Sequence, residues 1–380
     1  MNTIKTLAIC ALAFMTSSVA AQEDTKSKTA DVQKKYSYRV VKENKYTPVK
    51  DQAKSGTCWC YAGTSFLESE ALRKGKKELD LSEMFSVYHQ YRLKAEKYVR
   101  MHGQSRFSPG GQASDVMDVY RLYGAVPQEV YEGLTDDELV NDHGDLHREL
   151  RQFLDTLIKK RKIRGDWREA FDGILKRYLG CPPEEFVYQG KKYTPRSFAD
   201  KMIGLNMDEN VYLVSWKSEP AYKKTVLEVP DNWTWEKYWN VPLDDMIKCI
   251  DTALERGYTV AWSSDMSESY FSTPLGMAYV PKDDKWKLED GPCEEKVIDE
   301  DLRQWAYDTY RTVDDHAMHI VGTATDDAGT KYYIIKNSWG TDPGYKGMYY
   351  ISEAFMRYKT ICLIINRGGM PEDVMAKLSE

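Results

Sequence analysis

The sequence of 380 residues has no surplus of basic side chains and, beyond residue 21, no hydrophobic run long enough to span a bilayer. Its 59 acidic and 53 basic side chains give a net charge of −6, and no long basic stretch occurs, so we expect no nucleic-acid partner. Internal repeats and low-complexity tracts are also lacking. Histidine and cysteine are scarce, with six and seven residues, which leaves few candidates for nucleophilic or metal chemistry.

The first residues have the composition of a secretory signal peptide. Lys5 precedes an apolar run over residues 7–15, and small residues follow up to Ala21. We expect residues 1–21 to be removed by cleavage after Ala21, and we favour this over a retained N-terminal anchor. The mature protein is then exported, either periplasmic or secreted, and not associated with a membrane. The polar, lysine-rich residues 22–45 are predicted to form a flexible leader.

The cysteine count argues against a dense disulfide framework. Cys10 leaves with the signal peptide, and six cysteines remain: Cys58, Cys60, Cys181, Cys249, Cys293 and Cys362. If one of them is a free nucleophile, five are left, and five cannot all pair. We therefore expect at most one or two disulfides.

The chain changes character from helices to strands along its length. Apolar spacing and capping residues predict helices that begin at Cys58, after Ser82 and at Ala113. Residues 134–240 are charged, aromatic and helix-rich, with amphipathic helices over 146–162 and 167–178. A further helix over 244–256 is followed by strands, and the predicted strands cover residues 258–263, 316–323, 332–336, 347–351 and 360–365.

Cys58 has the sequence context of a catalytic thiol. A thiol attacks a carbonyl carbon well only as a thiolate, and the start of a helix favours the negative charge. Gln52 lies six residues earlier (58 − 52), across a turn that contains Gly56. Its side-chain amide is therefore expected to reach back and donate a hydrogen bond to the oxyanion of the reaction.

His316 is the predicted base for this thiol. It begins a strand, and Asn337 follows 21 residues later (337 − 316), at the end of the next strand, where its amide would fix the imidazole tautomer. Trp339 would shield that hydrogen bond from water. His319 is the rival base, but residues 316 and 319 point to opposite faces of a strand, so only one of them serves.

Together these motifs resemble those of the papain-like cysteine peptidases. The similarity is carried by Gln52, the Cys58-Trp59 pair, the run from Asp315 to Ala317 and the run from Asn337 to Gly340, in that family's order. The resemblance implies an α+β fold with two lobes, one helical and one β-barrel-like, and with the active site between them. It also implies the catalytic residues Cys58, His316, Asn337 and Gln52, supported by Trp59 and Trp339.

Spacing favours one branch of that family. His316 follows Cys58 by 258 residues (316 − 58), against roughly 130–150 in simple papain-type enzymes. Stretches such as 80–83, 110–112, 123–127 and 240–243 resemble bleomycin hydrolase, also called aminopeptidase C. The resemblance implies a peptidase domain over residues 46–377. It is expected to comprise a helical lobe over about 58–133, a helical insertion over about 134–240 and a β-rich lobe over about 241–366.

The resemblance also implies an activity and a mode of substrate binding. The protein is expected to be an aminopeptidase acting on peptides through an acyl-enzyme, without cofactor or metal. Gly110 and Gly111 are expected to line the groove for the substrate backbone, and a homohexamer is the assembly typical of this branch. The chain ends soon after Pro371, so the C-terminal arm that restricts this branch to amino termini is expected to be short. Endopeptidase activity and a non-catalytic peptide-binding role are the alternatives.

The remaining cysteine and histidine candidates are expected to be structural. Cys60 is two residues after Cys58 in a helix and should face the core. His143 and His147 have the spacing of a zinc helix, but Gly144 lies between them and the usual glutamate is missing, so a solvated surface is predicted. His89 and His102 are expected at the surface or in packing contacts.

Overall fold

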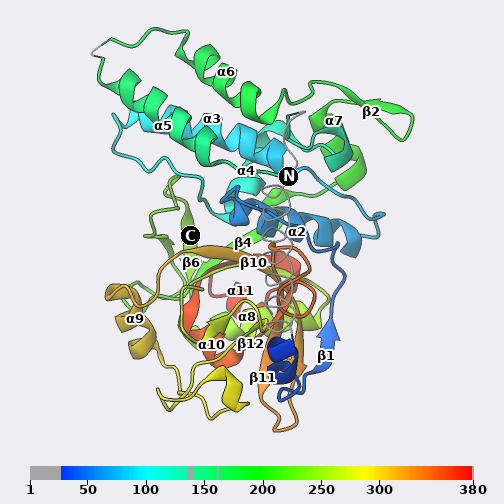
Figure 1. Cartoon of the computed structure of the whole chain (residues 1–380), viewed down its shortest axis with the longest axis vertical. Coiled ribbons are helices and arrows are strands. Elements are labelled where there is room, and N and C mark those ends of the chain that lie inside the picture. Colours follow the sequence, from blue (N-terminus) through cyan, green and yellow to red (C-terminus); the bar gives the residue numbers. More distant parts are fainter. Residues whose placement is uncertain (1–26, 136–139, 161, 379–380) are drawn as a thin grey trace, which may run out of the picture.

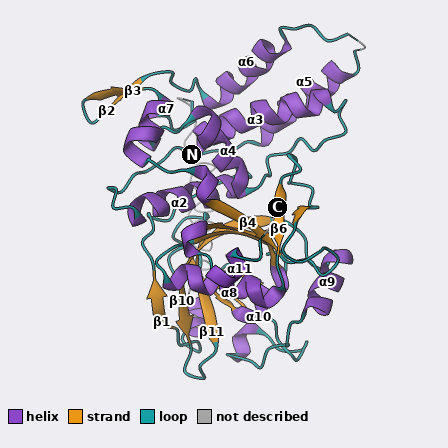
Figure 2. Ribbon diagram, turned by 180° about the vertical axis from the view of Figure 1, so that it is seen from behind, coloured by secondary structure: helices purple, strands orange, loops and turns teal. Residues whose placement is uncertain are grey.

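The protein has two lobes, one made mainly of helices and one built on a large curved sheet. The computed structural model describes residues 27–135, 140–160 and 162–378. Figure 1 shows helices α3, α5 and α6 at one end and the strands at the other, with α2 lying across the boundary between them. The view from behind shows the same division (Figure 2). The predicted α+β, two-lobed architecture is confirmed.

The helices begin and end where local sequence signals place them. The α-helices are α2 (Cys58–Arg73), α3 (Glu83–Arg100), α4 (Ala113–Tyr123), α5 (Gly144–Ile158), α6 (Trp167–Leu179), α7 (Pro195–Phe198), α8 (Leu243–Glu255), α9 (Glu300–Asp308), α10 (Glu353–Lys359) and α11 (Glu372–Met375). Ser82 caps α3, where its hydroxyl accepts a hydrogen bond from the Phe85 N–H at 3.1 Å. Gln112 and Asp115 form a reciprocal capping box at the start of α4. Gly124, with φ of 90°, follows its last turn, because glycine adopts this backbone conformation with little strain.

Eleven strands form the main sheet within the described residues. They are β1 (Arg39–Glu43), β4 (Asn210–Val214), β5 (Lys224–Val226), β6 (Lys237–Asn240), β7 (Val260–Ser264), β8 (Phe271–Ser272), β9 (Met277–Ala278), β10 (His316–Thr325), β11 (Lys331–Lys336), β12 (Met348–Ser352) and β13 (Thr360–Asn366). Their order is β5-β6-β4-β13-β7-β10-β11-β12-β9-β8, with β1 pairing with β10. A separate hairpin joins β2 (Phe186–Tyr188) and β3 (Lys191–Tyr193).

Strand β10 lies at the centre of the protein and brings the two lobes together. Helix α2 of the helical lobe packs against it, and so does α8. Because both faces are covered, its residues from His316 to Gly322 are all buried, and an apolar run can serve as a strand without alternating with polar residues. The start of β10 therefore lies against the first turns of α2, where Cys58 is located.

Two predictions about the chain's organisation are wrong in part. The segment 22–45 was expected to be flexible, yet residues 39–43 form β1, which pairs antiparallel with β10, and Tyr36 is buried in an aromatic cluster. The insertion over 134–240 was expected to be helical, but it also supplies β4, β5 and β6 to the main sheet. In both cases the strand is fixed by pairing with residues distant in the sequence, which local patterns do not reveal.

The last described residues pack on the sheet lobe. Lys377 donates to the Tyr222 hydroxyl at 3.2 Å and pairs with Asp245 of α8 at 3.4 Å, and Leu378 packs against the same apolar core. Over the described ranges, no helix combines the length and apolar character that membrane crossing requires. The predicted signal peptide, residues 1–21, lies outside the described residues.

Candidate active site

Cys58 is the first residue of α2 and is partly exposed at the boundary between the lobes. The N–H groups of a first helical turn have no partner within the helix, and the helix dipole adds positive potential there. The neighbouring Trp59 is buried and fixes the helix start, because its indole N–H donates to the Pro109 carbonyl at 2.9 Å. The thiol predicted to be the nucleophile therefore lies where the backbone favours a thiolate.

The structure brings this thiol to the strand that carries His316. The Cys58 sulfur accepts a hydrogen bond from the backbone N–H of Ala317, the residue that follows His316 in β10, and another from Trp59. Residues separated by more than 250 positions (316 − 58) thus meet at one point. The predicted juxtaposition of Cys58 and His316 agrees with this geometry.

His316 is held by the partner that the sequence predicted. Its Nε2 lies 2.7 Å from Oδ1 of Asn337. That oxygen also accepts the Ser338 N–H at 2.8 Å, which identifies it as the carbonyl oxygen, so Nε2 must be the donor. Nδ1 is then the nitrogen without the proton and is available to take one from a thiol. The Trp339 ring lies 4.4 Å from the imidazole, centroid to centroid, and covers it as predicted.

Gln52 is positioned by the same segment. Its side-chain oxygen accepts a hydrogen bond from the Ser338 hydroxyl at 2.7 Å, and its backbone N–H donates to the Ser338 carbonyl at 2.8 Å. Because the oxygen is engaged, the amide N–H₂ remains the group able to donate to an oxyanion. Ser338 was not singled out from the sequence as a functional residue, although it lies between Asn337 and Trp339.

Burial opposes charge on both members of the catalytic pair. It raises the pKa of the Cys58 thiol to about 12, an effect that the N–H of Ala317 opposes and the charge of Asp314 reinforces. Burial lowers the pKa of His316 to about 4, and the bond to Asn337 partly offsets this. The helix start led us to expect a thiolate at Cys58, but desolvation favours the neutral thiol and the neutral imidazole. The helix start and the backbone N–H groups favour the thiolate.

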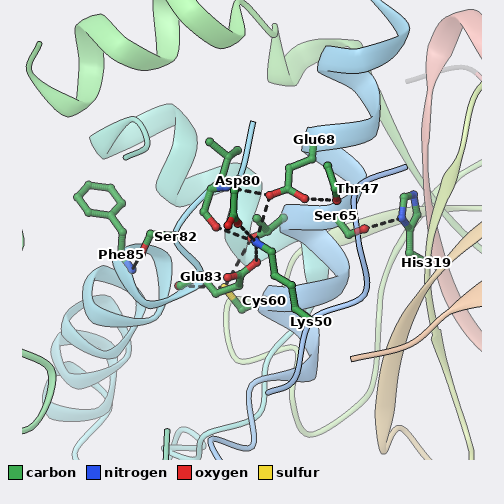
Figure 3. Close-up of polar contacts among 12 residues, drawn as sticks. Thr47, Lys50, Cys60, Ser65, Glu68, Asp80, Ser82, Glu83, Phe85 and His319 are labelled. Carbon is green, nitrogen blue, oxygen red and sulfur yellow. Dashed lines mark hydrogen bonds and ion pairs between the residues drawn. The ribbon is translucent and has the colours of Figure 1, made fainter. Parts of the chain in front are cut away.

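A partly buried network of charges lies at the start of the helical lobe (Figure 3). The Lys50 ammonium contacts three carboxylates, those of Asp80 at 2.6 Å, Glu83 at 2.7 Å and Glu68 at 3.2 Å. The other oxygen of Glu68 accepts the hydroxyl of Thr47. These residues link the segment before Cys58 to helices α2 and α3.

The same network accounts for His319. Its Nδ1 lies 2.9 Å from the Ser65 hydroxyl of α2, and this hydroxyl also accepts the ammonium of Lys336 at 2.8 Å. His319 is completely buried, and burial lowers its pKa well below the ordinary value. It is a neutral group joining the lobes, and the choice of His316 as base agrees with this placement.

The predicted groove glycines lie beside the start of α2. A Cβ on Gly111 would approach the Trp59 ring to 3.2 Å and the Asp115 carboxylate to 2.5 Å, and a Cβ on Gly110 would clash with Asp231 at 2.0 Å. A larger residue at either position therefore requires the neighbouring aspartate side chain to shift. The carbonyl of Gly110 accepts the buried ammonium of Lys94, which holds this loop in place.

The other candidates have structural surroundings. Cys60 is buried as predicted, and its thiol donates to the Glu83 carbonyl at 3.2 Å. All six cysteines of the described residues are free thiols. His89 stacks on Tyr123, but His143 is 3% exposed, so the predicted solvated surface at 143 and 147 is wrong for this residue. No group of three or more His, Cys, Asp or Glu side chains suited to a metal ion occurs in the part of the chain that the structure describes.

This arrangement is that of a papain-like cysteine peptidase, with thiol, imidazole, amide and oxyanion donor converging from two lobes. The chain belongs to the Peptidase C1-like family, whose sequence pattern it matches over residues 2–380.

Relatives identify the branch inferred from the sequence. The chain is 22% identical to "Aminopeptidase C" of Lactococcus lactis subsp. cremoris over 374 residues, covering 87% of this chain and 83% of that protein. It is also 22% identical to "Cysteine proteinase 1, mitochondrial" of Saccharomyces cerevisiae (strain JAY291) over 384 residues, covering 88% and 77%. The crystal structure of PepW from Lactobacillus rhamnosis HN001 superposes with a TM-score of 0.72 at 20% identity, over 92% of this chain and 86% of that one. The predicted family resemblance is confirmed.

Proposed function

We propose that this protein is a cysteine aminopeptidase that releases residues from the amino ends of peptides. The observation that carries the proposal is the contact of the Cys58 thiol with the start of β10, where His316 is held by Asn337 at 2.7 Å. The similarity to Aminopeptidase C supports the restriction to amino ends.

The geometry supports a two-step hydrolysis. Nδ1 of His316 takes the thiol proton as the Cys58 sulfur bonds to the carbonyl carbon of the substrate. The oxyanion receives hydrogen bonds from the Cys58 N–H, which lacks a helical acceptor, and from the Gln52 amide. When the tetrahedral intermediate collapses, the C–N bond breaks and the imidazolium gives its proton to the departing amine. Water, deprotonated by His316, then hydrolyses the thioester and restores the thiol.

Neutral resting groups are compatible with this sequence of events. Moving a proton from thiol to imidazole creates two charges within one site without changing the total charge. The imidazolium is then stabilised by the Asn337 oxygen, and the thiolate by the N–H of Ala317 and the start of α2. The unfavourable proton transfer is offset because the thiolate bonds to the substrate carbonyl carbon as it forms.

The test is removal of the thiol. Cys58→Ala is expected to abolish hydrolysis of a fluorogenic aminoacyl amide under reducing conditions, together with covalent labelling by a thiol-directed epoxide. Cys181→Ala is the matched control, since it removes an exposed thiol far along the chain and should leave both signals intact. Hydrolysis that persists in Cys58→Ala excludes the proposed mechanism.

Two alternatives are separated by the choice of substrate. An endopeptidase cleaves a peptide whose amino end is blocked as readily as a free one. A non-catalytic relative binds peptides but releases no product from either. The Cys58 thiol beside the start of β10, the His316–Asn337 hydrogen bond and the Ser338 contact of Gln52 together argue for catalysis.

Export and assembly belong to the same proposal. The basic and apolar residues at the N-terminus support export with cleavage after Ala21, which intact-mass measurement of the protein recovered from a secreting host tests. Assembly into a homohexamer is typical of the branch that the sequence resembles, and light scattering of the purified protein gives the number of copies.

A further inference from the structure

A buried amide at the start of α4 holds an acidic side chain in place. Gln112, which caps α4, is 1% exposed. Its oxygen accepts hydrogen bonds from the Ser263 hydroxyl at 3.0 Å and from the Cys362 thiol at 3.3 Å. Its N–H₂ group donates to Oδ2 of Asp314 at 2.5 Å. Since the amide oxygen is already used, this bond fixes one Asp314 oxygen as an acceptor and orients the carboxyl group.

Asp314 lies two residues before His316 and within electrostatic reach of the thiol. Its charge raises the pKa of Cys58, as described above. The charge of Asp231, whose carboxylate lies next to Gly110, also raises it. Residue 314 is partly exposed and directly precedes the segment that carries His316. A group bonded to the Cys58 sulfur would therefore lie within electrostatic reach of this carboxyl group.

The carboxyl group of Asp314 is less directly compensated by a cation than that of Asp231. Across residues 27–135, 140–160 and 162–378, no lysine, arginine or histidine nitrogen forms a salt bridge with it, whereas neighbouring Asp231 is paired with Arg106 at 2.8 Å. Burial and the charges of Asp231 and Asp315 raise the pKa of Asp314 to about 8, whereas the hydrogen bond from Gln112 and the charge of Arg106 oppose this rise. A buried carboxyl group without a salt-bridge partner is costly for the free protein, and such groups cluster at functional sites.

We propose that Asp314 is a specificity-determining residue that binds the protonated α-amino group of the peptide substrate. This inference rests on the proposed function and deepens it, because it assigns the preference for amino ends to a side chain of the peptidase domain. An α-ammonium brings the missing positive charge and donates to the carboxyl oxygen that Gln112 does not occupy. An acylated amino end has no charge and one N–H, so it loses this interaction.

A purely structural role makes a different prediction. If Asp314 only orients Gln112, then Asp314→Asn should be silent, because an asparagine oxygen accepts the same hydrogen bond. Asp315→Asn is the matched control for charge. Its carboxylate accepts the backbone N–H groups of Met266 at 2.8 Å and Ser267 at 3.0 Å and does not contact Gln112.

The experiment compares kcat/KM for an aminoacyl coumarin amide and its N-acetylated counterpart. We expect Asp314→Asn to lower kcat/KM for the free-amino substrate at least tenfold and to change that for the acetylated one by less than about threefold. Asp314→Glu should restore part of the preference, and Asp315→Asn should change both substrates by the same factor. Titration of the Cys58 thiol with the epoxide shows that each variant has a folded site.

The outcomes separate this inference from the proposed function. If the wild type prefers the free amino group and Asp314→Asn keeps that preference, Asp314 is not the amine-binding residue, while the aminopeptidase stands. If Asp314→Asn slows both substrates equally, its role is positioning and the inference is wrong. If the wild type prefers the acetylated substrate, the aminopeptidase and this inference both fail, but the cysteine peptidase remains. If it hydrolyses neither, the proposed function itself is overturned.

Discussion

Lys336 is a buried cation whose removal has a predictable effect on stability. It is 5% exposed and is the last residue of β11, directly before Asn337. Its ammonium donates to the hydroxyls of Thr47 at 3.0 Å and Ser65 at 2.8 Å, but it forms no salt bridge within the described residues. Burial lowers its pKa to about 8, although the charge of Glu68 partly opposes this.

The sign and size of the effect follow from proton linkage. Because the pKa is lower in the folded than in the unfolded chain, the folded chain binds fewer protons in this range, and the free energy of unfolding rises with pH. The cost of the buried charge is fully present below pH 8 and disappears as the pH approaches 10.5. The interval from 10.5 to about 8 corresponds to about 3 kcal/mol. Between pH 7 and pH 10, about 2.5 kcal/mol of this cost should be relieved.

Lys336→Met removes the charge while keeping most of the side-chain volume. The measurement is urea unfolding of wild type and variant at pH 7 and pH 10. The difference between the two proteins is compared at each pH, because the titrations of tyrosine and cysteine affect both proteins equally and cancel. The free energy of unfolding of the wild type, minus that of Lys336→Met, should rise by about 2.5 kcal/mol from pH 7 to pH 10. Lys331→Met, on the same strand but with a partly exposed ammonium paired to Asp251, is the control and should show no comparable rise. Parallel pH curves for wild type and Lys336→Met would refute the reasoning.

Two further predictions concern the catalytic residues. Asn337→Ala should lower kcat about 10- to 100-fold, because a hydrogen bond to a charged imidazolium contributes about 1.5–3 kcal/mol; an unchanged kcat, with the same number of epoxide-reactive thiols, would show that His316 has another orienting group. Gln52→Ala should lower kcat by about 10²–10³ with little change in KM, since its amide acts on the oxyanion and not on the bound substrate. A rise in KM at constant kcat would instead assign Gln52 to substrate binding.

Local signals were sufficient for the longer helices α2, α3, α4, α5, α6 and α8 and for the central strands, but α7, α9, α10 and α11 were not predicted. Ser82 and Gly124 mark helix boundaries because a hydroxyl cap and a positive φ are properties of single residues. The strands over 316–325 and 331–336 were found because both faces of the sheet are covered, which leaves a continuous apolar run. The candidate catalytic residues were predicted because the chemistry allows few residue types, the sequence contains only six histidines, and the motifs resemble those of papain-like peptidases.

What the sequence did not reveal depends on contacts between distant segments. Strand β1 has five exposed residues and no apolar pattern. It forms a strand because it pairs antiparallel with residues 322–325 of β10. The burial of His143 follows from the packing of α5 in the helical lobe, which a helix-face argument in isolation does not capture. Asp314 is two positions from His316, but its proposed role depends on its contact with Gln112 and on its distance from a salt-bridge partner, and both depend on tertiary structure.

The buried polar contacts between the lobes have a consequence for catalysis. The nucleophile belongs to the helical lobe, whereas the base and its orienting amide belong to the sheet lobe, so the distance between the reacting groups is set by how the lobes pack. Apolar surfaces can slide past each other with little cost. The hydrogen bond between Ser65 of α2 and His319 of β10, and the one from Lys336 to Ser65, require a particular arrangement of the lobes. Because Lys336 and Asn337 are consecutive, the bonds that fix the lobe interface also fix the residue that orients His316. We therefore expect this network to contribute more to the geometry of the catalytic pair than to the stability of the fold.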